Sequence, residues 1–346
     1  MTDRLSDSVL RKISKQKPKG RVCFFPNFSL DFSLNTSRSF SSLVQKMREV
    51  HDNGGGDVTD DSIAEFSLGG CSAISAHCHA MLGGKSYFIG QMDSFGKTIL
   101  THFFKQSGAK MYVKQGSKLP FTLILEVGNS NLMFSDTLEY SSKDPRAFEI
   151  IKKSKILSMQ GYWAVVKPQL AETFLRKARS NGVLTYIDTS DPINFKKQIP
   201  RFLSLFDKQL VNIFSVNDNE AIQYASFIDG RKFSNPVDAA GILSDRLKVE
   251  INLHTRNFSV IFRSDRENVR VPGFLLKRVQ KLTGAGDNWV AGNLYAICLG
   301  LEPEERLLFA NAVSGYYITE RHSPNLKEVI SFIKTHRMQN PTPKRD

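Results

Sequence analysis

The stretch from Lys281 to Gly300, KLTGAGDNWVAGNLYAICLG, joins a turn of small residues to a single carboxylate and then to an apolar segment. Residues 283–286 can form a tight turn without side-chain crowding, and the spacing after Asp287 predicts a buried helix. The first amides of such a helix have no backbone partner and lie at the positive end of its dipole, so they favour an anion. A carboxylate at Asp287 could accept the proton of a hydroxyl that attacks a phosphoryl group. The same pattern also fits an ordinary helix start, so the rest of the chain has to separate the two interpretations.

Asn217 and Glu220 form a second pair of interest, because they follow the apolar run VNIFSV, which predicts a buried strand. At a helix start these two side chains lie one turn apart and can face the same point, where an amide oxygen and a carboxylate suit hydrated Mg²⁺. The alternative is structural, with Asn217 as the helix cap and Glu220 closing a capping box. For the pair alone, the structural interpretation is favoured.

The elements around these residues predict a sheet whose strands all end near one edge. The run VCFFPN predicts a strand that ends near Asn27, and Asp31 follows shortly after it. Gly69 and Gly70 open a helix of small residues that can lie close against a sheet. From residue 147 onward, strands alternate with helices. We therefore expect an α/β fold with a doubly wound, mostly parallel sheet, and a ligand crevice at the carboxyl ends of its strands.

Two further segments predict a smaller sheet. Residues 32–66 are rich in Ser, Asp, Asn and Gly and show little helical periodicity, and residues 111–137 alternate like strands. We expect these two segments to pair as a small β-sheet lid. The open strands of such a lid favour association of two copies, so a homodimer through the lid is one expectation.

The composition fits a globular protein, with 346 residues, 41% hydrophobic residues and no apolar run long enough to cross a membrane. Its four cysteines predict reduced core thiols of a cytoplasmic protein rather than a disulfide framework. Part of the net charge of +13 falls in residues 1–20 and 341–346, where we expect a basic N-terminal extension and a C-terminal tail, both mobile. Because no stripe of basic and aromatic residues appears, nucleic acid and membranes are not expected partners.

Two other motifs are rejected. GGKS at residues 83–86 is similar to the end of a P-loop, but His79 stands where that motif needs its first glycine. His79 also belongs to a cluster with Cys71, His77 and Cys78, which lacks the ligand spacing of a metal centre.

In the order of its motifs the chain resembles the ribokinase, or PfkB, family of carbohydrate and nucleoside kinases. An Asp follows the first strand, a Gly pair opens a helix, an Asn and a Glu separated by two residues follow a mid-chain strand, and TGAGD precedes AG and a C-terminal helix with Asn311. The match spans about Val22 to Met338. The resemblance implies a kinase domain over residues 21–340 that transfers the γ-phosphoryl group of ATP to a hydroxyl, with Mg²⁺ as cofactor and the lid excluding water.

The resemblance also implies roles for single residues. Asp287 would be the base that deprotonates the acceptor, and the amides of Gly284, Ala285 and Gly286 would form the anion hole. Magnesium would be held, through water, by Asn217 and Glu220. The remaining implied contacts divide between the two substrates. The acceptor would contact Asn27, Asp31, Gly69 and Gly70, and the nucleotide would contact Asn217, Glu220, Asn252, His254, Thr283 and Asn311.

The chain departs from the family pattern at several places, among them the segment GQMDSFG from Gly90 to Gly96, which differs from the usual pattern. Ile74 stands where many relatives carry Asn in the helix after the Gly pair. Asn252, Leu253 and His254 replace a Thr-Leu-Gly group beside the nucleotide. Lys281 replaces an Asp that belongs to a monovalent-cation site in many relatives. One hypothesis is that the ammonium of Lys281 supplies the charge of that cation. The alternative is that Lys281 points into water.

The identity of the acceptor stays open at this stage. The positive net charge leaves room for a sugar acid or a sugar phosphate, while phenylalanines around Asp31 leave room for a nucleoside base, although these rings are more simply explained as core and lid packing. A noncatalytic protein that binds a nucleotide or a sugar on the same fold is the alternative function. The absence of GxGxxG after a predicted strand disfavours a nicotinamide-dependent dehydrogenase.

Overall fold

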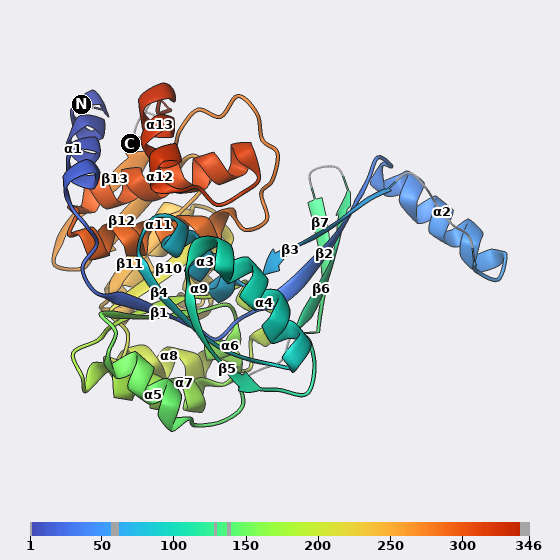
Figure 1. The fold of residues 1–346 in the computed structure, drawn as a ribbon, viewed down its shortest axis with the longest axis horizontal. Helices are drawn as coiled ribbons and strands as arrows, with labels where there is room; N and C mark the ends of the chain where they lie inside the picture. The colour runs from blue at the N-terminus through green and yellow to red at the C-terminus, as the bar shows by residue number, and fades with distance from the viewer. Residues whose placement is uncertain (1, 57–61, 128–129, 137–139, 340–346) are drawn as a thin grey trace.

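The computed structural model describes residues 2–56, 62–127, 130–136 and 140–339, and Figure 1 shows how they are arranged. A nine-stranded sheet has the order β13-β12-β11-β10-β9-β8-β1-β4-β5. Neighbouring strands from β11 to β5 run parallel, and β12 and β13 are antiparallel additions at one edge. The strands are β1 (Arg21–Phe25), β4 (Lys85–Met92), β5 (Lys110–Gln115), β8 (Ile156–Gln160), β9 (Leu184–Asp188), β10 (Ile213–Asn217), β11 (Glu250–His254), β12 (Phe258–Arg263) and β13 (Arg266–Pro272).

Helices cover both faces of this sheet, so its central strands are apolar on both sides. In β1, Val22 and Phe24 belong to one hydrophobic core, whereas Cys23 and Phe25 belong to the other. The first core is formed with α1 (Thr2–Lys15), α3 (Cys71–Met81), α4 (Ser94–Ser107), α11 (Ala285–Leu299), α12 (Pro303–Glu320) and α13 (Leu326–Thr335). The second is formed with α5 (Pro145–Lys152), α6 (Trp163–Val166), α7 (Pro168–Arg179), α8 (Ile199–Asp207), α9 (Asp218–Asp229) and α10 (Pro236–Leu247), and a short 3-10 helix, η1 (Pro192–Phe195), precedes α8.

A four-stranded sheet of order β3-β2-β6-β7 stands beside the main body (Figure 1). Its strands are β2 (Ser29–Thr36), β3 (Ser62–Gly69), β6 (Phe121–Val127) and β7 (Ser130–Asp136). The pairs β2–β3 and β6–β7 are antiparallel, and β2–β6 is parallel. The helix α2 (Phe40–Asp52) lies between β2 and β3 in the chain and projects away from the rest of the molecule, with none of its residues buried.

The expected α/β fold, with a large mostly parallel sheet and a small sheet, is confirmed. Two details of the expected lid segments, 32–66 and 111–137, are wrong. Residues 110–115 form β5 of the large sheet, where they pair with β4. The sequence does not distinguish the two sheets here, because the alternation of KMYVKQ fits an edge strand of either one. Residues 40–52 form a regular helix although the sequence shows little helical periodicity there, and Ser39 caps the helix by accepting a hydrogen bond from Ser42 N.

The expected mobile N-terminal extension is also wrong over most of its length. Val9 and Ile13 of α1 are buried in the first core, and the Lys12 Nζ and Ser8 Oγ atoms donate to the two carboxylate oxygens of Glu305 on α12, each at 2.7 Å. The prediction followed the basic composition of this segment and overlooked its apolar residues, which recur at helical spacing. The expected tail, residues 341–346, lies outside the described residues.

We expect Ile13→Ala to lower the free energy of unfolding by about 2–5 kcal/mol, because it empties a fully packed position between α1 and the core. Urea unfolding followed by circular dichroism measures this change. Arg11→Ala, at an exposed position of the same helix, serves as the control and should stay within about 0.5 kcal/mol of the unmodified protein. Equal losses, or none in either variant, would contradict the packing of α1.

Candidate active site

The carboxyl ends of β9, β10 and β11 bring together groups that lie far apart in the sequence. Asp188 ends β9, Asn217 ends β10 and His254 ends β11. The start of α11, with Asp287, lies at the same edge, because Asp188 acts electrostatically on Asp287 and a Cβ at Gly286 would lie 3.4 Å from His254 Cε1. This edge is where an open α/β sheet binds its ligands.

The turn before α11 needs glycine for a steric reason. Gly284 has φ 90° and is the residue before the first helical residue, Ala285. A Cβ on Gly284 would lie 2.6 Å from the hydroxyl oxygen of Tyr317, which itself donates to the Thr283 carbonyl at 2.6 Å. The turn therefore packs tightly against α12, and the helix begins where the sequence predicts it. The first amides of an α-helix lack intrahelical partners and can bind an anion. In this helix the amide of Ala285 already donates to the Leu282 carbonyl at 3.0 Å, so an anion would have to compete with that bond.

Asp287 is held in surroundings that disfavour its charge. Burial, then the negative charges of Asp188 and Asp31, raise the pKa of Asp287 to about 7, while a hydrogen bond from the Cys71 thiol acts in the opposite direction. The Ser75 hydroxyl on α3 donates to the Asp287 carbonyl at 2.8 Å and fixes the backbone. A carboxyl with a pKa near 7 is suited to take up a proton from a substrate at physiological pH.

A cavity of about 420 Å³ opens beside Asp287 and contains most of the predicted acceptor residues. Its walls include Asn27, Asp31, Gly70 and Gly284. Gly69 does not line the cavity, but its lack of a side chain is required, since a Cβ there would lie 1.8 Å from Asp31 Oδ1. Gly69 therefore makes room for the carboxylate, and Gly70, with φ 81°, forms the turn into α3.

Asp31 is the second carboxylate of this cavity. Burial raises its pKa to about 6, against the effects of a hydrogen bond from Ser29, the positive charge of Lys281 and a hydrogen bond from Thr122. Ser29 Oγ donates to Asp31 Oδ1 at 2.6 Å. The positive charge of Lys281 thus acts on Asp31. Its expected role as a substitute for a monovalent cation stays a prediction.

Asn217 and Glu220 form the capping box that was the structural alternative. Asn217 Oδ1 accepts from Glu220 N at 2.9 Å, and Glu220 Oε2 accepts from Asn217 N at 3.1 Å. Burial, followed by the negative charge of Asp188, raises the pKa of Glu220 well above its ordinary value. The capping box fixes Glu220 at an edge where other carboxylates already lie, and such an arrangement favours a nearby cation.

Asp188 is a further candidate residue at this edge, and no motif in the sequence singles it out. Its Oδ2 atom is buried without a hydrogen-bond partner and lies 3.7 Å from His254 Nε2, which is also buried and unpartnered. An orphaned carboxylate oxygen next to Glu220 and Asp287 is consistent with a hydrated cation at this place. The available signal was the strand VLTYID, which ends in an Asp at the same edge as Asn217.

Among the described residues, no group of three or more His, Cys, Asp or Glu side chains forms a metal centre. The Cys71, His77, Cys78 and His79 cluster is no exception, and His79 is instead a core residue whose Nδ1 lies 2.8 Å from Ser86 Oγ. Any magnesium would therefore be held by few protein ligands together with water and phosphate, as is usual for this ion.

Two of the predicted nucleotide residues are placed as supports of α11. Asn311 Oδ1 accepts from Trp289 Nε1 at 2.8 Å and from Ser259 Oγ at 2.6 Å. Asn252 Oδ1 accepts from Asn293 Nδ2 at 2.6 Å, within a buried network that includes Arg306. His254 differs, because its ring stacks on Trp289 at 4.7 Å between centroids while its Nε2 faces the crevice edge.

The small sheet contacts the main body on the site side. Asn131 Nδ2 of β7 donates to Thr283 Oγ1 at 3.1 Å, and Arg321 Nη2 pairs with Glu65 Oε2 of β3 at 2.6 Å. Thr283 and Asn131 both line the cavity beside Asp287. The small sheet is thus one wall of the site, as expected for a lid.

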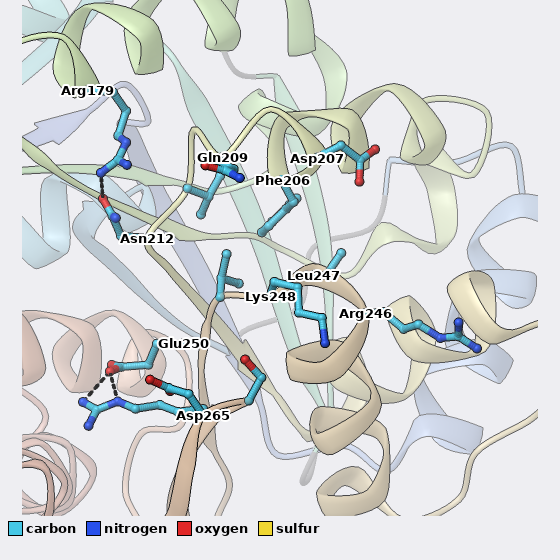
Figure 2. Close-up of a pocket in the computed structure, with 14 residues that line it drawn as sticks. Arg179, Phe206, Asp207, Gln209, Asn212, Arg246, Leu247, Lys248, Glu250 and Asp265 are labelled. Carbon is cyan, nitrogen blue, oxygen red and sulfur yellow. Dashed lines mark hydrogen bonds and ion pairs between the residues drawn. The ribbon is translucent and has the colours of Figure 1, made fainter.

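A larger cavity, of about 650 Å³, lies at the opposite edge of the large sheet (Figure 2). It opens at the amino ends of β10 and β11, next to Asn212 and Glu250. Figure 2 shows Arg179 directed at Asn212, with Nη1 donating to Oδ1 at 3.2 Å. Glu250 is paired with Arg263 and Arg306. Because these charges are mutually satisfied and far from the strand ends that carry Asp188 and Asn217, this cavity is not the reaction site.

Comparison with known families agrees with this geometry. The model of the family described as pfkB family carbohydrate kinase matches residues 39–327. The chain belongs to this family. It is accordingly a phosphotransferase of a kinase family that uses ATP. The match includes the turn before α11, Asn217, Glu220 and Gly70.

Curated relatives of this pfkB kinase include proteins named 5-dehydro-2-deoxygluconokinase. Those of Bacillus anthracis and Bacillus thuringiensis subsp. konkukian are each 25% identical over 291 residues, which cover 78% of this chain and 86% of the relative. Among solved structures, the adenosine kinase of Sinorhizobium meliloti is 20% identical, with a TM-score of 0.70, over 92% of this chain and 99% of that one.

The ribokinase of Arabidopsis thaliana, solved with ribose and ATP, has a TM-score of 0.68 and 17% identity, again over 92% and 99% of the two chains. At this level of identity, the two solved structures establish the fold.

No helix among the described residues is long and apolar enough to cross a membrane.

We expect Asp287→Asn to become more stable relative to the unmodified kinase as the pH rises. Asp287 has a folded pKa of about 7 and an unfolded value of about 3.9, so the folded state binds more protons between these values and loses stability as the pH rises through them. The asparagine variant is free of this loss, so the difference in free energy of unfolding should grow by about 1.4 kcal/mol per pH unit in that window. Urea unfolding at pH 5, 6, 7 and 8 measures it. Asp265→Asn, whose side chain is 74% exposed, should show no such trend. A difference that does not change with pH would show that Asp287 titrates normally.

Proposed function

We propose that this pfkB kinase transfers the γ-phosphoryl group of ATP to a hydroxyl of a sugar, a sugar derivative or a nucleoside, with Asp287 as general base. The observation that carries the proposal is the position of Asp287. Its carboxyl has a pKa raised to about 7 and lies at the start of α11, next to the amides of the 284–286 turn and at the wall of a cavity that holds Asp31. Base, anion site and acceptor space therefore adjoin each other.

In the proposed reaction, the Asp287 carboxylate takes the proton of the acceptor hydroxyl. The acceptor oxygen forms a bond to the γ-phosphorus, the bond from that phosphorus to the β–γ bridging oxygen breaks, and ADP leaves with the bond's electron pair. The amides of Gly284, Ala285 and Gly286 stabilise the charge on the transferring group. Asp31 orients the acceptor, together with Asn27 and the turn at Gly69 and Gly70. The small sheet excludes water that would otherwise accept the phosphoryl group.

Magnesium fits the acidic edge of the sheet. We propose that Asn217, Glu220 and Asp188 hold it through water, where it would neutralise phosphate charge. The unpartnered Asp188 oxygen and the electrostatic effect of Asp188 on Glu220 support this assignment.

On the nucleotide side, we propose that Thr283 and His254 lie against the phosphates. The placement of Asn252 and Asn311, whose amides bond to protein atoms, supports an indirect role in which they hold α11 in register. Their loss would then misplace Asp287 and the anion site without removing a nucleotide contact.

Two broader features are proposals as well. We propose a homodimer through the small sheet, supported by the exposure of Ile63, Phe66, Leu132 and Phe134 on its edge strands β3 and β7; a monomer in sedimentation equilibrium would oppose it. We also propose a cytoplasmic location, supported by four free cysteines; cell fractionation tests it.

Asp287→Asn should lower turnover by about 100-fold to 10,000-fold, the usual contribution of a general base, with little change in binding of the acceptor. ADP release is measured from ATP and Mg²⁺ against a panel of sugars, sugar acids, sugar phosphates and nucleosides. Asp265→Asn, remote from the site, is the matched control and should keep full turnover. Unchanged turnover in Asp287→Asn would refute the assignment of the base, and ATP binding without turnover of any acceptor would favour a noncatalytic binding protein.

Turnover should be the same in sodium, potassium and a large organic cation if the Lys281 ammonium replaces the monovalent ion of relatives. Lys281→Gln removes the charge and should make turnover depend on potassium. Initial rates at constant ionic strength test both statements. Marked potassium activation of the unmodified kinase would dispose of the hypothesis.

A further inference from the structure

We propose that the acceptor of this kinase is an uncharged polyhydroxylated molecule, either a neutral sugar or polyol or a nucleoside, and not a sugar acid or a sugar phosphate. This inference rests on the kinase function proposed above. It differs from what the names of the curated relatives would suggest for this chain, since 5-dehydro-2-deoxygluconate is a sugar acid. It also narrows the class of acceptor, because the net charge of the whole chain leaves room for a sugar acid or a sugar phosphate.

The charge of the cavity carries the inference. Two carboxylates, Asp31 and Asp287, line it, and the described lining residues include no Lys, Arg or His. The internal segments outside the described part of the chain, residues 57–61, 128–129 and 137–139, contain no Lys, Arg or His in the sequence, whereas residues 340–346 contain Lys344 and Arg345. Among the described residues, the basic side chains therefore lie outside the lining of this cavity. A site for a carboxylate or phosphate usually offers Arg, Lys or a helix start to that group. Two helix starts reach the cavity. That of α11 is already required for the transferring phosphoryl group, and that of α3, at Gly70 and Cys71, lies beside the Asp31 carboxylate, which packs against Gly69.

Lys281 is a cation whose charge acts on the Asp31 carboxylate of the cavity, where it opposes the effect of burial. Asp188, Asp31 and Asp287 interact electrostatically as like charges at the same edge. A further negative charge on the acceptor would add to this repulsion next to the triphosphate of ATP. A neutral acceptor avoids it.

The uncharged lining residues fit the hydroxyls of such a molecule. Asn27, Ser29, Thr122 and Ser135 present amide and hydroxyl groups on the side of β2, β6 and β7. Ile74, which stands where many relatives carry a polar Asn, adds an apolar surface together with Leu282. Sugars and nucleosides combine a rim of hydroxyls with an apolar ring face, and a mixed wall of this kind suits them.

The experiment compares acceptors that differ in charge and little else. ADP release is measured with ATP and Mg²⁺ for glucose against gluconate and glucose 6-phosphate, ribose against ribose 5-phosphate, and adenosine against AMP. We expect kcat/KM to be at least about 100-fold higher for the neutral member of whichever pair is used, because of the unpaired like charge in the others. Sugars and nucleosides are separated by which pair responds. An acid or phosphate that matches or exceeds its neutral partner, in a reaction abolished by Asp287→Asn, would overturn the inference while leaving the kinase function intact.

Asp31→Asn provides a second test that does not depend on the absolute rate. Removing one of the two carboxylates should raise the ratio of kcat/KM for the charged over the neutral acceptor by about tenfold or more. Asp265→Asn is the matched variant, because it removes a carboxylate that is exposed and does not line the cavity, and it should leave the ratio unchanged. An unchanged ratio in Asp31→Asn would count against the charge argument.

Binding separates a failure of this inference from a failure of the kinase function. Thermal shifts of the full chain are recorded for the same compounds with a nonhydrolysable ATP analogue and Mg²⁺. Stabilisation by a neutral compound without any turnover would support the acceptor class and refute the kinase function. Stabilisation by acids or phosphates alone, or by no neutral compound, would overturn the inference.

Discussion

The charge of Asp287 is the feature on which the site depends, because the protein holds an ionisable group where ionisation is costly. The group lies close to Asp188 and Asp31, and the negative charges of these two residues repel a negative charge on Asp287. Burial and the neighbouring negative charges favour the protonated form of Asp287, whereas the helix start beside it favours the ionised form, as would a cation bound to a phosphate donor. The pKa of Asp287 is therefore about 7, close to physiological pH. Binding of a charged ligand nearby then decides whether the carboxyl holds a proton. Substrate binding can therefore set the protonation state of the proposed base.

That arrangement needs a rigid frame, and the two cores supply it. Trp289 on α11 is fixed between Asn311, Ser259 and the ring of His254. Further along the same helix, Asn293 is tied to β11 and α12 through Asn252 and Arg306. These buried polar contacts are directional, so they fix the rotation of α11 about its axis more strictly than apolar packing would. The position of Asp287 follows from that rotation.

Much of the frame is predictable from the sequence. The alternation of strands and helices gives the parallel sheet, and TGAGD gives the turn and helix that hold Asp287, since both follow from local periodicity and from glycine geometry. Prediction from the sequence is wrong where one segment fits two local patterns. The strand at residues 110–115 fits either sheet, and its partner is decided by distant residues of β4. The sequence did not predict the packing of α1, because charged residues dominate the composition of that segment.

The site residues divide in the same way. Asn27, Asp31, Gly70 and Asp287 were expected together and line one cavity. Asp188 was missed because its importance comes from what surrounds it in space and not from any spacing along the chain. Asn252 and Asn311 were expected at the nucleotide because of their positions in a motif order, while their hydrogen bonds face the interior. Motif order identifies the strand ends and helices involved, but it does not give the direction in which each side chain points.

The junction between the small sheet and the main body has a mechanical consequence. β3 ends at Gly69 and α3 begins at Cys71, so Gly70 alone joins them. The same helix carries Ser75, which donates to the backbone carbonyl of Asp287 at 2.8 Å. If the small sheet swings, this connection takes up the movement by rotation about the backbone bonds of Gly70 or passes it along α3 towards Asp287. A Cβ on Gly70 would lie 2.4 Å from Phe28 Cα, so any larger residue at this joint would collide with the segment that leads into β2.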